Sequence, residues 1–157
     1  MNQTYRRRNS LRLSDYDYKK EGAYFVTISC YNKLPLFKDF LPKSVVEKNI
    51  KSLENRFSVI VNGYAIMPDH LHLLAIGAND NSNLKKFITL FKQKSGYWYK
   101  KNYCTNLWHI SYYDHVLRKE ENKENVALYI LGNPVRKGLV SDFKEYPFGW
   151  SFWTDQS

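Results

Sequence analysis

The sequence predicts an α+β domain of the split βαβ type, in which an antiparallel sheet carries helices on one face and leaves the other face open. Three observations predict this class. Four segments have the composition of strands, three others place apolar residues at helical spacing, and they follow the order strand, helix, strand, strand, helix, strand, helix. At 157 residues the chain has room for one such domain and little more.

The first half of the chain is expected to hold a strand, a helix and a hairpin. Residues 23–31 are rich in β-branched and aromatic side chains, which is typical of a strand. Residues 43–56 follow a proline-punctuated connection and show helical spacing. Two apolar runs, 57–67 and 70–76, are separated by a short turn, and this separation favours an antiparallel hairpin.

The second half is expected to hold two helices around a fourth strand. Residues 84–99 form the first of these helices, and residues 107–117 form the strand. The last helix covers 119–131 and ends at Gly132 and Pro134, which are ordinary stop signals.

Around this core the chain divides into three parts. Residues 1–22 are polar and basic and are interpreted as an arm, residues 23–145 as the folded domain, and residues 146–157 as an aromatic C-terminal tail. A basic arm of this kind can grip a hairpin stem through its phosphates, or it can be a disordered tail that aids solubility.

The charge balance indicates a polyanionic partner. The formal net charge is +9, from 24 Lys and Arg against 15 Asp and Glu. Nucleic acid is favoured over a membrane surface because no amphipathic basic helix stands out, although a basic chain need not bind either. No apolar run could cross a bilayer and no signal peptide is recognisable, so a cytoplasmic protein is expected, associated with the nucleoid when bound to DNA. Cys30 and Cys104 have no metal-binding or redox spacing and are expected to be free thiols.

His70 and His72 form the first chemical constellation. Side chains in a strand alternate between faces, so the two imidazoles point the same way while Leu71 and Leu73 point into the core. Such a pair makes a rigid bidentate metal site that a third ligand and water would complete. The alternative is a pair of histidines at an exposed strand end, one of them capping a turn.

Tyr129 and Asn133 form the second constellation. They lie four residues apart, so both fall on one helical face if the last helix extends that far. The phenol of Tyr129 is a possible nucleophile, and the carbonyl oxygen of Asn133 suits a hard divalent cation. The alternative is that Tyr129 is one of many packing residues among 13 tyrosines and that the Asn before Pro134 is a helix stop.

These groups suit attack on a phosphodiester. A divalent cation polarises a non-bridging oxygen and neutralises the charge that develops in the transition state. A phenol has a reference pKa of about 10 and needs such assistance to react at neutral pH. The product would be a covalent phosphotyrosine, and the chain has no Gly-rich phosphate loop that would indicate a nucleotide cofactor.

Lysines alternate with aromatic residues along and just after the second helix, which is the composition of a single-strand groove. The alternative is a solvated lysine face over a packed aromatic stripe. His109 and His115 have even spacing in the fourth strand, and His115 beside Asp114 could transfer protons or pack at the rim.

With both constellations assembled, the chain resembles the REP-associated tyrosine transposases. These are single-tyrosine members of the His-hydrophobic-His (HUH) transposases, relatives of insertion-sequence transposases that move as single strands. The matching segments together span nearly the whole chain, and they include Met67-Pro68-Asp69-His70-Leu71-His72 and Tyr129-Ile130-Leu131-Gly132-Asn133-Pro134. Further matching segments lie in the same order at residues 6–8, 11–13, 16–18, 22–28, 73–74, 108, 112–118 and 135–140.

The resemblance implies the HUH nuclease fold, which is ferredoxin-like, and a transposase that cuts single-stranded DNA carrying palindromic hairpins. It implies His70, His72 and Asn133 as ligands of Mg²⁺ or Mn²⁺ and Tyr129 as the nucleophile, leaving a 5′-phosphotyrosine and a free 3′-hydroxyl. The protein would act as a monomer or a homodimer. The residues expected to contact DNA are Arg6, Arg7, Arg8, Arg12, Lys85, Lys92, Arg118 and Arg136.

Two positions depart from the family pattern. Asp69 stands where Asn is common and adds a negative charge near the metal, and Gly132 costs about 1 kcal/mol of local helix stability relative to alanine. Neither removes a catalytic group, and Gly132 could let Tyr129 move. A non-catalytic module that binds hairpin DNA or RNA is the main alternative, and a replication-type nickase would normally carry a helicase domain as well.

Overall fold

Five strands form one antiparallel sheet in the order β4-β1-β3-β2-β5. The computed structural model describes Tyr18 and residues 21–155. The strands are β1 (Gly22–Ser29), β2 (Val59–Met67), β3 (His70–Gly77), β4 (Tyr113–Val116) and β5 (Gly149–Ser151). The helices are α1 (Phe40–Leu53), α2 (Leu84–Tyr103), α3 (Lys123–Leu131) and the single turn α4 (Asn133–Arg136), with 3-10 turns η1 (Tyr31–Lys33) and η2 (Phe143–Glu145).

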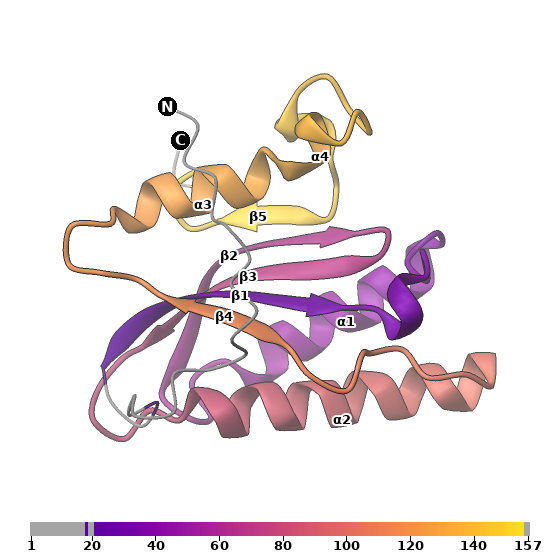
Figure 1. The fold of residues 1–157 in the computed structure, drawn as a ribbon, viewed down its shortest axis with the longest axis horizontal. Coiled ribbons are helices and arrows are strands. Elements are labelled where there is room, and N and C mark those ends of the chain that lie inside the picture. The colour runs from indigo at the N-terminus through magenta and orange to yellow at the C-terminus, as the bar shows by residue number, and fades with distance from the viewer. Residues whose placement is uncertain (1–17, 19–20, 156–157) are drawn as a thin grey trace.

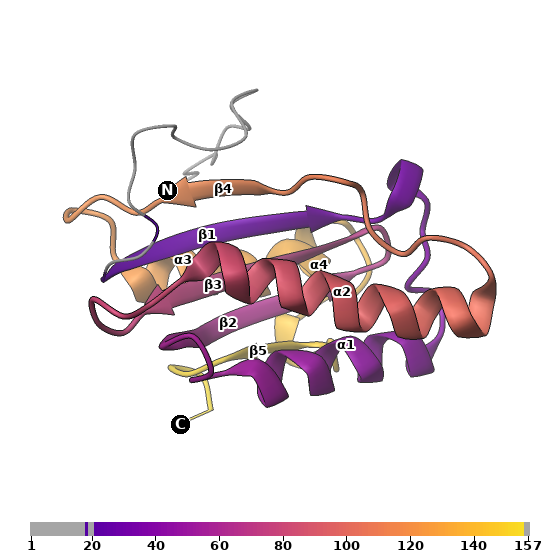
Figure 2. The same ribbon diagram turned by 90° about the horizontal axis from the view of Figure 1, so that it is seen from below.

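The first four strands have the topology that the sequence predicts. β1, α1, β2, β3, α2 and β4 follow one another along the chain, and their strand order β4-β1-β3-β2 is that of the split βαβ fold. Figure 2 shows the strands in this order, with α1 and α2 lying across the near face. The predicted α+β class is therefore confirmed.

β5 is an addition that the sequence analysis did not anticipate. It lies within the aromatic segment 146–157 and pairs with the free edge of β2, where Tyr64 faces Trp150 with their rings 6.0 Å apart. A strand of three residues carries almost no periodic signal, so its pairing is visible only once β2 is in place.

Helices cover both faces of the sheet, as Figure 1 shows, with α1 and α2 on one side and α3 and α4 on the other. α1 and α2 seal the larger core against alternate residues of β1, β2 and β3. On the opposite face, which the sequence analysis expected to be open, Val126, Ala127 and Ile130 of α3 pack against Phe25 and Leu74. The cover is close at Gly63, where an added Cβ would lie 3.4 Å from the Cβ of Ala127. That face is therefore only partly open.

Element boundaries differ from the expected ones mainly before β4. The predicted strand 107–117 is regular only over Tyr113–Val116. Its first part instead continues the sheet edge as an irregular segment, because Cys30 and Trp108 form an isolated bridge and the amide of His109 donates to the carbonyl of Ser29 over 2.9 Å. In the residues described, no helix combines the length and the apolar character needed to cross a bilayer.

Candidate active site

His70 and His72 lie at the start of β3, immediately after the turn from β2. Their Nε2 atoms are 3.0 Å apart, and His70 is only 7% exposed. Leu71, which lies between the two histidines, and Leu73, which follows them, are fully buried in the core under α1 and α2. The alternation expected from the sequence therefore holds, and the buried leucines fix the direction of the imidazoles.

The other nitrogen of each imidazole has its own partner. Nδ1 of His70 lies 2.6 Å from Oδ1 of Asp69, and Nδ1 of His72 lies 2.9 Å from Oγ1 of Thr27. A carboxylate only accepts, so Nδ1 of His70 is the donor and, in the neutral ring, Nε2 carries a lone pair. When Nδ1 of His72 donates to Thr27, both Nε2 lone pairs face the same point. Outer partners of this kind hold metal-binding histidines in the tautomer and orientation that coordination requires.

Asn133 reaches the same point from another element. It begins α4, it is 6% exposed, and its Nδ2 lies 3.2 Å from Nε2 of His70. A half-turn of the carboxamide places Oδ1 where Nδ2 now lies, because the two ends of an amide have nearly the same shape. Asn133 can therefore either donate from Nδ2 to Nε2 of His70 or present Oδ1 to a cation.

Tyr129 lies in the last turns of α3, beside the histidine pair. Its ring meets the edge of Phe25 at a centroid distance of 6.3 Å, and Phe25 in turn stacks on His72 at 5.2 Å. On its other side, Cζ of Arg136 lies 3.9 Å from the centre of the Tyr129 ring. Nη2 of Arg136 also donates to the Tyr129 carbonyl over 2.7 Å, so the tyrosine is held through both ring and backbone.

Gly132 makes the contact between Arg136 and Tyr129 possible. A Cβ at this position would lie 2.8 Å from Nη1 of Arg136 and 3.3 Å from the carbonyl oxygen of Leu128. The glycine has ordinary helical angles, φ −74° and ψ −9°, so space rather than backbone conformation demands it. Gly132 thus separates α3 from α4 and leaves room for the Arg136 side chain to fold back.

The structure brings Tyr129 and Asn133 together, although not on one helix as the sequence analysis supposed. α3 ends at Leu131 and Asn133 starts α4, with Pro134 in the first turn where a missing N–H costs nothing. A cleft of about 350 Å³ contains the whole constellation. Its lining residues are Phe25, Thr27, His70, His72, Tyr113, Tyr129, Asn133, Arg136 and Lys137.

The other histidines lie elsewhere. Nε2 of His115 is 2.9 Å from a carboxylate oxygen of Glu121, and Nδ1 of His109 accepts from the amide of Ser111. Within the described part of the chain, no group of three His, Cys, Asp or Glu side chains is arranged to hold a metal. Asn133, whose side chain lies 3.2 Å from Nε2 of His70, is a residue of another type that could serve as a third ligand.

The predicted DNA contacts are scattered. Arg136 lies in the cleft, Lys85 is exposed at the first turn of α2 with its Nζ 4.9 Å from the centre of the Tyr18 ring, and Arg118 is exposed beyond β4. Nζ of Lys92 donates to the carbonyls of His109 and Ile110, which anchors that loop to α2. Arg6, Arg7, Arg8 and Arg12 lie outside the described residues.

Four further residues line the cleft, and of these the sequence analysis had considered only Tyr113, as an alternative nucleophile. Thr27 and Phe25 come from β1, Tyr113 from β4, and Lys137 follows α4. The strand register puts Thr27 directly opposite both His72 and Tyr113. The local signal for Thr27 was weak, because β1 also contains Tyr24 and Ser29, and the partner of Thr27 could not be identified from the sequence.

The chain is similar to known proteins of one family. Residues 20–133 match the family described as "Transposase IS200 like". A REP-associated tyrosine transposase of Escherichia coli strain K12 is 24% identical over 83% of this chain and 77% of its own. A candidate REP-associated tyrosine transposase of Haemophilus influenzae is 28% identical over 87% of this chain and 84% of its own.

A solved structure has the same fold. It is described as a REP-associated tyrosine transposase bound to a REP hairpin, and it superposes with a TM-score of 0.72 at 20% identity, over 91% of this chain and 85% of the other. The resemblance drawn from the motifs of the sequence is confirmed.

Proposed function

Because the chain belongs to the IS200-like transposase family, whose members are enzymes that act on DNA, we propose that it is a metal-dependent single-strand DNA endonuclease and strand transferase with Tyr129 as its nucleophile. One observation carries the proposal. Side chains from β3, α3 and α4 converge in a single cleft, with the paired Nε2 atoms of His70 and His72, the amide of Asn133 and the phenol of Tyr129 side by side.

We propose a hairpin-forming single strand as the substrate. The relative of known structure is described as bound to a REP hairpin, and this chain has a net charge of +9. Positive charge favours binding to a phosphate backbone but does not select a sequence. The hairpin is therefore inferred from the similarity to this relative, and binding to a polyanion is inferred from the composition.

The residues of the cleft fit a divalent metal. Two imidazole nitrogens that face each other at 3.0 Å, each ring held from behind by Asp69 or Thr27, are a preformed pair of donors. Asn133 supplies the hard oxygen that Mg²⁺ and Mn²⁺ prefer. When bound, such a cation would act as a Lewis acid on a non-bridging phosphate oxygen.

Tyr129 performs the covalent step in this proposal. Its phenol oxygen attacks phosphorus, the bond from phosphorus to the 3′-oxygen breaks, and the phenol loses its proton while the leaving oxygen gains one. The products are a 5′-phosphotyrosine and a free 3′-hydroxyl. Arg136 has two functions: its guanidinium holds the Tyr129 ring in place, and its charge lies where phosphate oxygens must enter.

The test is formation of a covalent adduct on an oligonucleotide that carries a palindromic hairpin, with Mg²⁺ or Mn²⁺ present. The wild-type chain should give an adduct that survives denaturing electrophoresis, and Tyr129→Phe should give none while binding the hairpin with unchanged affinity. Tyr31→Phe, an exposed tyrosine that does not line the cleft, is the matched control.

Two results would contradict the proposal. An adduct formed by Tyr129→Phe would move the nucleophile to another residue, of which Tyr113 lies in the same cleft. Hairpin binding by the wild-type chain with no adduct under any divalent metal would instead support a non-catalytic binding module.

A further inference from the structure

The active-site cleft continues into two neighbouring hollows along the β4 edge of the sheet. It shares Thr27 and Tyr113 with a second hollow of about 170 Å³. The second shares His109 with a third hollow of about 340 Å³, which lies between α2 and residues 106–110. The three hollows are linked in succession by these shared lining residues, and the row that they make, from Tyr129 to the C-terminal half of α2, is called the β4-edge track below.

The β4-edge track has one sign of charge. Among the described residues, none that lines it is Asp or Glu, in a chain that has 15 of them. Its basic residues are Lys33, Lys92, Lys100, Arg136 and Lys137. A groove lined by a single sign of charge concentrates the opposite charge, so the chemistry of the path selects a polyanion.

The far end of the track also has exposed apolar surface. Tyr97 on α2 is 73% exposed and Ile110 is 93% exposed, and both line the third hollow. Large apolar side chains exposed at this level contribute nothing to the core. Aromatic faces and apolar groups beside basic side chains are the means by which proteins hold unpaired bases.

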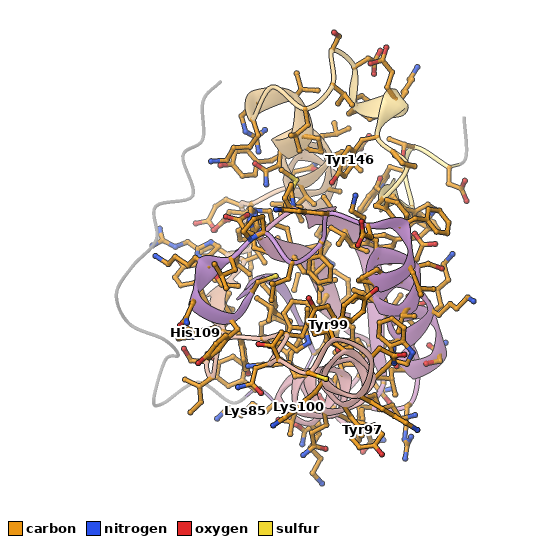
Figure 3. All side chains as sticks on the ribbon, turned by 90° about the vertical axis from the view of Figure 1, so that its right-hand side faces the viewer. Lys85, Tyr97, Tyr99, Lys100, His109 and Tyr146 are labelled. Carbon is orange, nitrogen blue, oxygen red and sulfur yellow. The ribbon has the colours of Figure 1, made fainter. Side chains whose placement is uncertain are left out.

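Residues 106–110, which form one wall of the third hollow, are held in place by contacts with α2. Trp108 is buried against Phe37 and Phe91, and its Nε1 donates to Oγ of Ser95 over 2.8 Å. Lys92 bridges from α2 to the loop carbonyls. Figure 3 looks towards the end of the molecule where α2 finishes and shows Lys100, Tyr97 and His109 there. The segment therefore presents Ile110 and His109 from a fixed position.

We propose that the β4-edge track binds the single-stranded DNA that flanks the hairpin on one side of the cleavage point. Its phosphates lie near Lys33 and Lys100, and its bases pack on Tyr97 and Ile110. The inference rests on the proposed function of Tyr129, which fixes the point where the track begins. It adds that the segment 106–111 and α2 make the affinity for DNA depend on the length of the flank, which the cleavage chemistry does not require.

The first experiment measures binding by fluorescence anisotropy with the whole chain in EDTA, so that no cleavage occurs. Hairpins with flanks that are lengthened stepwise should bind more tightly than the bare hairpin. Lys33→Gln with Lys100→Gln should remove this gain and lower the salt slope by about 0.7 for each phosphate that is no longer neutralised. Lys48→Gln with Lys144→Gln, two exposed lysines outside the track, is the matched control.

The second experiment tests stacking. Tyr97→Ala should weaken binding of flanked hairpins about 5-fold or more, and Tyr97→Phe should restore it, because the ring rather than the hydroxyl carries the contact. Binding of the bare hairpin should not change in either variant. Equal losses of affinity for the track and control lysines, or affinity that does not depend on flank length, would overturn the proposal.

The two proposals can fail separately. If Tyr129 forms the adduct but the affinity for hairpin DNA does not depend on flank length, DNA binding by the track is rejected and the proposed chemistry stands. If affinity depends on flank length through Lys33 and Lys100 but no adduct forms with any metal, DNA binding by the track is supported and the proposed chemistry is rejected.

Discussion

The two faces of β3 serve opposite purposes although their residues alternate along one strand. Leu71 and Leu73 point into the core beneath α1 and α2 and are completely buried. His70 and His72 point to the other face, where each imidazole has a polar partner behind it. The apolar face stabilises the fold, and it also fixes the direction of the imidazoles on the polar face, where the proposed chemistry would take place.

The polar face is itself divided along its length. Beside Leu74, α3 covers the strand with Val126 and Ile130, and this half is a second small core. Beside His70 and His72 lie the last turn of α3, which holds Tyr129, and the single turn α4, which the chain enters through Gly132. The cleft lies at this end of α3, where Tyr129 and Asn133 line it together with the histidines.

Substitutions at two neighbouring residues of β3, one on each face, should differ most in their effects on stability and on adduct formation. Leu73→Ala should cost about 2–5 kcal/mol of unfolding free energy, because it leaves a cavity in a close-packed core. His72→Ala should cost about 1 kcal/mol, the scale of a single hydrogen bond, and should abolish adduct formation. Urea denaturation and the adduct assay separate the two effects. Equal losses of unfolding free energy in the two variants would mean that both faces of β3 contribute equally to stability.

Gly132→Ala should separate stability from activity within the polar face. Gly132 lies between α3 and α4 rather than inside a helix, and alanine can adopt its φ of −74° and ψ of −9°, so the free energy of unfolding should change by less than about 1 kcal/mol. The new Cβ would displace the Arg136 guanidinium from Tyr129, and adduct formation should fall roughly 10- to 100-fold through misplacement of the reacting group. Arg136→Ala is the matched variant. Full activity in Arg136→Ala would show that Arg136 does not position Tyr129.

The two cysteines should give the smallest effect and report on the apolar face. Burial raises the pKa of the Cys30 thiol to about 12, so this thiol stays protonated at neutral pH, whereas Cys104 is exposed at the end of α2. A thiol reagent at neutral pH should therefore label one cysteine in the folded chain and two after denaturation. Rapid labelling of both in the folded chain would show that the core around Cys30 opens.

Much of the fold followed from local patterns. The strand β3, the leucine and histidine alternation, and the order of strands and helices depend on residues close in sequence, and all of them match the structure. β5 and the placement of α3 did not follow in this way. A three-residue strand and the choice of face for a crossing helix depend on surfaces that exist only after the sheet has formed.

The candidate site divides in the same way. His70, His72, Tyr129 and Asn133 could be named from residue type, spacing and the resemblance to a family. Their mutual distances, the support of His72 by Thr27, and the space that Gly132 leaves for Arg136 come from strand register and helix packing. The sequence alone determined which chemical groups are available, because spacing sets the face of a strand or helix. Tertiary structure alone decided which of them meet, because residues about sixty positions apart in the chain come together only through packing.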